Sequence, residues 1–220
     1  MVALFCVLAY GALLEEVRDV TALDGAETLV EDAFTEEELG EEWSWLREDP
    51  GDWRIVPLEG EEDGRALEIR ARPGDAHSVR NVLMRPVPDV GDDLLIIEVT
   101  VTRTAPFTEQ YEQAGMTWYQ GEDPDFKLVH ELVDGETVII PGFAPTDQDT
   151  VRIRLIVRGA GYTAQFRQAG EEAYQTVATG ELALGPDNII SLMTYHGPEE
   201  GDHWMRFTDF RIVRAPAPGD

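Results

Sequence analysis

The sequence predicts an all-β protein, a two-sheet antiparallel jelly-roll sandwich, and three observations lead to that prediction. From about residue 28 onward, nearly every segment is a short run of apolar and β-branched residues that ends at Gly, Pro, Asp or Asn. Helical periodicity of useful length is absent except near Glu36–Leu46, where we expect a turn or two of helix. Short strands without helices between them are typical of a sandwich or barrel. The 220 residues, 43% of them hydrophobic, suffice for one core and predict a single domain.

The expected strands follow one another with turn signals between many of them. Asp134-Gly135, between two alternating runs, is the strongest hairpin signal, because both residue types accept the positive φ angles of a type I′ turn. Other turn signals are Pro73-Gly74, Gly159–Gly161, Gly185-Pro186 and Gly197-Pro198. The expected strands are Thr28–Phe34, Asp52–Leu58, Ala66–Ala71, Asn81–Arg85, Leu94–Thr102, Gln113–Gln120, Phe126–Val133, Thr137–Pro141, Val151–Arg158, Tyr162–Gln168, Tyr174–Ala178, Ile189–Tyr195 and Trp204–Val213.

Period-2 alternation separates a core face from an outer face within these strands. In Phe126–Val133 the even-numbered positions are the more apolar set and are expected to face the core, which places His130 inward as a hydrogen-bonded core residue. Lys127 and Glu131 then lie on the opposite face of the sheet. A one-residue error in register would invert this assignment. The same reasoning predicts buried side chains at Trp118, Leu128, Ile153, Leu155 and Phe207.

Lys127 is the only lysine of the chain, and it lies in the middle of a predicted strand, four residues before Glu131. Antiparallel neighbours bring the outer-face side chains of several strands within reach of one another. Saccharide binding uses aromatic rings that stack on pyranose faces and planar polar groups that bind hydroxyls. The alternative is a plain Lys127–Glu131 salt bridge, which contributes little when exposed. The candidate ligand-binding residues are Gln113, Thr117, Tyr119, Lys127, Glu131, Arg154, Tyr195 and His196.

The charge of the chain restricts its partners. The formal net charge is −27 and the pI is about 4.3, so that like charge repels both nucleic acid and anionic membrane surfaces. We expect neither as a partner. The use of arginine in place of lysine, together with acidic residues along the whole length, indicates a GC-rich genome or a salt-adapted organism. The single cysteine, Cys6, excludes an intrachain disulfide and a cysteine-based zinc site.

The first fourteen residues, MVALFCVLAYGALL, are apolar. They are too few to span a bilayer but match the hydrophobic region of a signal peptide, although the positive n-region is missing. The competing interpretation is a short helix or strand that packs on the domain. We expect a signal-like segment or N-terminal extension over residues 1–27, a sandwich over 28–214 and a disordered tail over 215–220. An extracellular or cell-envelope location is favoured over a cytoplasmic one, and no other stretch is expected to span a membrane.

Three segments, Asp32–Ile55, Glu112–Gly135 and His203–Ile212, together resemble a known module. It is the concanavalin A-like β-sandwich module found at the C-terminus of bacterial β-xylosidases and as stand-alone proteins of unknown role. The resemblance runs from about Leu29 to Val213, and its most specific part is the order of motifs in Ala114–Tyr119, Phe126-Lys127 and Glu131–Gly135. It implies a two-sheet jelly roll with a concave face and a carbohydrate-related context. The chain departs from the glucanases that share this fold, because it lacks their E-x-D-x-x-E catalytic pattern.

These observations favour a non-catalytic carbohydrate-binding module, associated with polysaccharide or glycoside breakdown and with a separate glycosidase as a candidate partner. One alternative is a glycoside hydrolase that uses Glu131, with Glu112 or Glu109 as the second carboxylate. Another is a structural or interaction module without a ligand. No organic cofactor is expected. A structural Ca²⁺ is compatible with the many hard oxygen ligands, and Asp32 and Asp209 are its candidates because their strands are expected to be neighbours.

Overall fold

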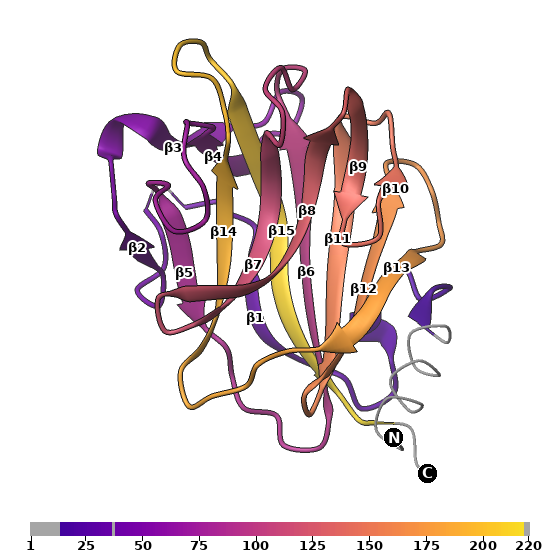
Figure 1. Cartoon of the computed structure of the whole chain (residues 1–220). Helices are drawn as coiled ribbons and strands as arrows, with labels where there is room; N and C mark the ends of the chain where they lie inside the picture. The colour runs from indigo at the N-terminus through magenta and orange to yellow at the C-terminus, as the bar shows by residue number, and fades with distance from the viewer. Residues whose placement is uncertain (1–13, 37, 218–220) are drawn as a thin grey trace.

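The computed structural model describes residues 14–36 and 38–217, and it consists of two packed antiparallel sheets (Figure 1). The eight-stranded sheet has the order β13 (Gln175–Glu181), β12 (Gly161–Gln168), β11 (Thr150–Arg158), β6 (Leu94–Arg103), β15 (Trp204–Ala215), β4 (Arg65–Arg70) and β3 (Trp53–Pro57), with β1 (Glu27–Asp32) also paired to β15. The seven-stranded sheet has the order β10 (Ala144–Pro145), β9 (Glu136–Ile140), β8 (Asp123–Val133), β7 (Gln113–Gln120), β14 (Asn188–Tyr195), β5 (Val82–Pro86) and β2 (Ser44–Leu46).

The predicted fold class is confirmed, and each expected strand corresponds to an observed one. The strand expected at Gln113–Gln120 has the same bounds as β7, while the others differ by a few residues at their ends. The sequence did not indicate the short edge strands β2 and β10 or the 3-10 helices Val20–Ala22 and Pro50–Asp52. The helical turns expected near Glu36–Leu46 are wrong, since the described residues there form bends, a turn and then β2.

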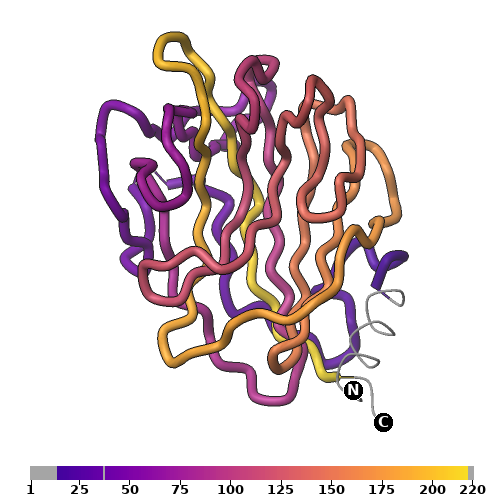
Figure 2. Tube along the Cα trace, in the orientation of Figure 1, coloured from indigo at the N-terminus to yellow at the C-terminus, as the bar shows by residue number. Residues whose placement is uncertain are grey.

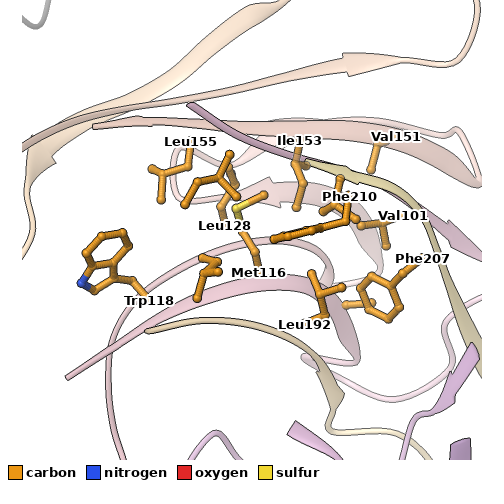
Figure 3. Packing of buried hydrophobic residues seen from close by; sticks show 14 of the residues in the cluster. Val101, Met116, Trp118, Leu128, Val151, Ile153, Leu155, Leu192, Phe207 and Phe210 are labelled. Atoms are coloured by element: carbon orange, nitrogen blue, oxygen red, sulfur yellow. The ribbon is translucent and has the colours of Figure 1, made fainter. Parts of the chain in front are cut away.

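The core lies between the two sheets and is drawn from the predicted inward faces (Figure 3). All five side chains that were predicted to be buried are buried. Trp118 and Leu128 come from the seven-stranded sheet, and they share one core cluster with Ile153, Leu155 and Phe207 from the eight-stranded sheet. His130 is also inward and fully buried, but the expectation that it is hydrogen-bonded is wrong. Within the described chain neither of its ring nitrogens has a partner, and its ring lies edge-on to Phe107 with centroids 5.2 Å apart.

Two smaller apolar clusters lie outside the sandwich. On the outer face of the seven-stranded sheet, Tyr119, Met193 and Tyr195 pack under the loop that contains Ala76 and Val79. On the outer face of the eight-stranded sheet, Leu14, Val20 and their neighbours cover Leu94, Ile96, Ile156 and Val213. Val213 and Ala215 near the end of β15 belong to this cluster, and Figure 2 shows the yellow end of β15 close to the indigo N-terminal segment.

The boundaries at the ends of the chain are placed only in part. The extension expected over residues 1–27 packs on the sheet from Leu14 onward, whereas residues 1–13, which hold most of the signal-like sequence, lie outside the described residues. The disordered tail expected to begin at residue 215 does not begin there, because Ala215 belongs to β15 and is 1% exposed. Its side chain is held in the outer cluster against the N-terminal segment. Residues 218–220 lie outside the described part.

Candidate binding site on the outer face of the seven-stranded sheet

The register of β7, β8 and β14 brings five of the predicted site residues together. Gln113 on β7 is directly opposite Glu131 on β8 and, on its other side, opposite Tyr195 on β14. Thr117 is opposite Lys127. Because residues two apart on a strand share a face, Gln113 and Thr117 lie on one face with Lys127 and Glu131, opposite the core residues Trp118 and Leu128. This confirms the predicted assignment of faces.

Lys127 is the central group of this cluster. Its Nζ donates to Gln113 Oε1 at 2.8 Å and to Glu131 Oε2 at 2.7 Å, and it lies 5.9 Å from the centre of the Tyr195 ring. Four residues of strand span about 13 Å, so the Lys127 and Glu131 side chains must extend toward each other along the sheet surface. The side chain of Lys127 is 32% exposed and that of Glu131 is 5% exposed. Lys127 is therefore the more accessible member of the pair.

A rim of aromatic rings borders the cluster at one end. Gln113 Nε2 donates to the backbone carbonyl of Tyr111 at 2.7 Å, which fixes Tyr111 at the start of β7. The Tyr111 ring is 6.1 Å from the His196 ring, and His196 is 5.2 Å from Tyr195. Tyr111 is 47% exposed and has φ 69°, an unfavourable backbone conformation for a bulky residue. Strain at an exposed ring beside a polar cluster is a feature found at binding sites.

The rim opens onto a hollow of about 580 Å³ between three loops. The loops contribute Pro73-Gly74, Glu109-Gln110 and the segment from His196 to Glu200. His196 N donates to Gly74 O at 3.1 Å, so that the first and third loops are joined by a backbone hydrogen bond. His196 lines this hollow, and its ring is the one that lies 6.1 Å from the exposed Tyr111 ring. Sequence reasoning missed Tyr111; the signal it left was an aromatic residue two positions before Gln113 in a loop that ends in a strand.

Thr117 contributes an unusual group to the same face. It is 2% exposed, and in residues 14–36 and 38–217 its Oγ1 has no hydrogen-bond partner. Gly115, the next outer-face position along β7, has no room for a side chain, since an added Cβ would lie 2.7 Å from the Cα of Val129. β7 and β8 therefore approach closely here, and the position between Thr117 and Gln113 is filled by the backbone of β8 and by the Val129 side chain.

Tyr119 and Arg154 do not belong to the accessible site, and both assignments are corrected. Tyr119 is on the predicted outer face but is fully buried, because the loop at Ala76 covers it and accepts a hydrogen bond from its hydroxyl at 3.2 Å. Burial raises the pKa of the Tyr119 hydroxyl to about 12. Arg154 is on β11, which lies between β6 and β12 in the other sheet. The prediction placed the strand beside β7 on alternation alone, and alternation carries no information about which sheet a strand joins.

The proposed metal ligands are both engaged with protein donors. Asp32 accepts hydrogen bonds from Phe34 N at 2.8 Å and from Trp43 Nε1 at 2.7 Å. Asp209 accepts from Thr100 Oγ1 at 3.2 Å and lies 3.7 Å from Arg152. Their strands β1 and β15 are neighbours, as expected. In the part of the chain that the structure describes, no group of three or more His, Cys, Asp or Glu side chains is arranged to hold a metal ion. A structural Ca²⁺ stays an untested prediction.

Glu112, one candidate for a second catalytic carboxylate, is fixed in the loop before β7. It is fully buried, its Oε2 accepts from Thr108 N at 2.7 Å and from Glu109 N at 3.3 Å, and its Oε1 is 2.7 Å from His203 Nδ1. Hydrolysis needs two carboxylates that face the same bound substrate. The contacts of Glu112 are those of a group that holds a loop in place. Both of its carboxylate oxygens are engaged in these contacts, so neither is free to act on a substrate together with Glu131.

Comparison with known proteins identifies the fold. No family model and no curated protein matches the sequence. Among solved structures, a xylan β-1,4-xylosidase from Bacillus halodurans C-125 superposes with a TM-score of 0.64 and 17% identity, over 84% of this chain and 39% of that one. The chain has the concanavalin A-like fold. The GH43 protein BlXynB from Bacillus licheniformis gives a TM-score of 0.63 and 16% identity over the same shares.

A carbohydrate esterase of the Shiga toxin-encoding bacteriophage phi24B is also similar, with a TM-score of 0.53 and 12% identity over 86% of this chain and 99% of that one. The concanavalin A-like chain described here spans about two fifths of the length of the two Bacillus proteins. Among its described residues, no helix has the length and apolar character needed to cross a membrane.

Proposed function

We propose that the protein is a non-catalytic carbohydrate-binding module that binds a neutral or weakly charged β-linked saccharide on the outer face of the seven-stranded sheet. The observation that carries the proposal is the exposed Tyr111 ring next to the hydrogen-bonded Gln113–Lys127–Glu131 cluster. An exposed ring stacks on one pyranose face, while the ammonium donates to ring hydroxyls.

The charge of the chain selects among saccharides. A net charge of −27 opposes a polyanionic polysaccharide at long range, even though Lys127 attracts an anion locally. A neutral saccharide, such as a β-1,4-linked xylo-oligosaccharide, is not repelled by this charge. Because an open sheet face buries only part of its ligand, we expect dissociation constants on the order of micromolar to millimolar.

Tyr111→Ala is the most informative variant, because the ring is exposed and its loss leaves the core intact. Titration calorimetry with xylohexaose should show saturable binding to the natural protein and a loss of most of it in Tyr111→Ala. Phe143→Ala is the matched control, since Phe143 is 65% exposed and likewise has a positive φ of 54°, but does not contact the cluster. Lys127→Met should also lose binding, and its melting temperature is measured in parallel because it leaves Glu131 without its cation.

Two outcomes would replace this proposal with its alternatives. Release of reducing sugar that disappears in Glu131→Gln would establish a glycoside hydrolase. An absence of retention on arrayed or insoluble glycans would favour a structural or interaction module. A separate glycosidase as partner is part of the proposal, and co-purification with a glycosidase from the same genome tests it.

A further inference from the structure

The opposite face of the sandwich carries a concentration of arginine. A pocket of about 310 Å³ on the outer face of the eight-stranded sheet is lined by Arg18, Arg152, Arg167 and Arg211 and by the acidic residues Asp19, Glu31 and Asp209. Arg154, on the same face of the sheet, is fully buried. The chain has only sixteen arginines against forty-four acidic residues. Four of them line this pocket together with three carboxylates, and Glu172 pairs with Arg18 at 2.6 Å beside it.

One buried carboxylate organises three of these arginines. Glu98 on β6 is fully buried, and it is paired with Arg154 at 2.6 Å, with Arg152 at 3.2 Å and with Arg211. Although burial raises the pKa of Glu98, the three guanidinium groups outweigh that effect and lower it to about 2. Glu98 is therefore ionised under all ordinary conditions and neutralises one of the three cations. Arg152 and Arg211 also line the pocket.

The acidic residues around the pocket balance this charge only loosely. Asp19 lies 3.0 Å from Arg211 with a side chain that is 57% exposed, and Asp209 lies 3.7 Å from Arg152 with a side chain that is 61% exposed. Exposed pairs of this kind contribute little and exchange readily with solvent ions. The guanidinium groups consequently retain donor capacity for another acceptor.

Arg167, on β12, supplies a donor that is not engaged. Its Nη1 donates to Glu171 O at 3.0 Å and its guanidinium lies 5.4 Å from the Tyr174 ring centre, but its buried Nε has no hydrogen-bond partner in the described structure. A buried donor without an acceptor is unfavourable, so an acceptor that enters the pocket and binds Arg167 Nε would stabilise the site.

The backbone at the pocket is irregular. The pairing of β15 with β6 shifts register between Thr208 and Arg211, and Asp209 within this bulge has φ 52°. A bulge redirects side chains relative to the regular strand, and bulges are frequent beside functional sites. Here the bulge places both Asp209 and Arg211 at the pocket.

We propose that this arginine pocket binds a small oxyanion, namely inorganic phosphate or sulfate, or the carboxylate group of a sugar acid. Planar guanidinium groups bind such oxyanions in bidentate fashion. The pocket volume is at the lower end of the range for small-molecule sites and fits a single ion or one sugar ring. The site is independent of the saccharide surface, because it belongs to the other sheet.

Calorimetric titration of the full chain with sodium phosphate, at ionic strength held constant with sodium chloride, tests the proposal. Saturable binding to one site is expected. Arg167→Gln should weaken it by at least about tenfold, because a charge-assisted hydrogen bond is lost. Asp209→Asn should strengthen it about fivefold by removing a nearby like charge, and asparagine tolerates the positive φ. Arg80→Gln, which makes the same change in net charge at an exposed arginine elsewhere, should bind phosphate like the natural protein.

Titrations with sulfate, glucuronate and glucose show which part of a ligand the pocket recognises. Binding of phosphate, sulfate and glucuronate would show that the oxyanion alone is recognised, and binding of glucuronate alone would identify a sugar acid. Both results support the site. The proposal is overturned if no anion binds saturably, if glucose binds as well as glucuronate, or if Arg167→Gln and Asp209→Asn both bind like the natural protein.

Discussion

His130 makes the free energy of unfolding depend on pH in a way that one substitution should remove. The side chain is fully buried between the sheets with neither nitrogen hydrogen-bonded, and burial, with a smaller contribution from Arg103, lowers its pKa to about 3. In the unfolded chain its pKa is about 6.5. Below pH 6.5 the unfolded chain takes up a proton at His130, whereas the folded protein keeps the ring neutral. The folded state therefore has its full stability above pH 6.5 and loses part of it as the pH falls toward 3.

The size of the effect follows from the two pKa values. Between pH 7.5 and pH 5.5 the unfolded state gains most of one proton at His130 and the folded state gains almost none, so the free energy of unfolding falls by about 1.4 kcal/mol. All other ionisable groups are common to the natural protein and His130→Leu, so their contributions cancel in the comparison of the two. Replacing His130 by leucine removes this contribution. It also removes two unsatisfied polar atoms, which should stabilise the folded state at pH 7.5 by about 1–3 kcal/mol.

Urea unfolding at pH 7.5 and pH 5.5 measures both the pH dependence of the free energy of unfolding and the effect of His130→Leu on it. The natural protein should lose about 1.4 kcal/mol more than His130→Leu on going from pH 7.5 to pH 5.5. If the two proteins lose the same amount, or if His130→Leu is less stable than the natural protein at pH 7.5, then His130 is not an unpartnered neutral group in the core and the reasoning is refuted.

Three further predictions concern stability. Tyr119→Ala should lower the free energy of unfolding in urea by about 3–5 kcal/mol, because the ring is fully buried. Tyr119→Phe should lower it by about 1 kcal/mol, because only the hydrogen bond to Ala76 is lost. An unchanged free energy of unfolding in Tyr119→Ala would contradict the covered position of the ring. Glu98→Gln should lower the free energy of unfolding by about 3–5 kcal/mol at pH 7, because it leaves three arginines without their shared carboxylate. The difference from the natural protein should shrink as the pH falls from about 4.5 toward 2, because the natural carboxylate then protonates. Equal stability of the two proteins at pH 7 would contradict the role of Glu98. The melting temperature should rise with sodium or potassium chloride in the sub-molar range, because salt screens the repulsion within a chain of net charge −27, and a flat or falling response would count against salt adaptation.

Local sequence patterns were sufficient for the strands and their faces. Alternation identified Trp118 and Leu128 as core residues and Lys127 as an outer one, because a half-buried strand has a side-chain period of two. Asp134-Gly135 joins β8 to β9 with positive φ at both positions, as the hairpin signal predicted. The short edge strands β2 and β10 left too few residues to show a period.

Long-range relations could not be derived in the same way. Arg154 alternates outward, as predicted, but its strand joins the other sheet, where the backbone carbonyls of Leu14 and Val17 accept from its guanidinium at 2.9 and 2.8 Å. Tyr119 is outward, but a loop more than forty residues earlier covers it. Both corrections have one physical cause: alternation reports which way a side chain points and not what packs against it.

The most direct test of the proposed saccharide site is a titration of ¹⁵N-labelled protein with xylohexaose, followed by amide chemical shifts. The account predicts that the largest changes occur at Tyr111, Gln113, Lys127, Tyr195 and His196, and that the amides of β11 and β12 on the other sheet stay unchanged. Shifts concentrated around Arg152 and Arg167, or no shifts at any concentration up to several times the expected millimolar limit, would contradict it.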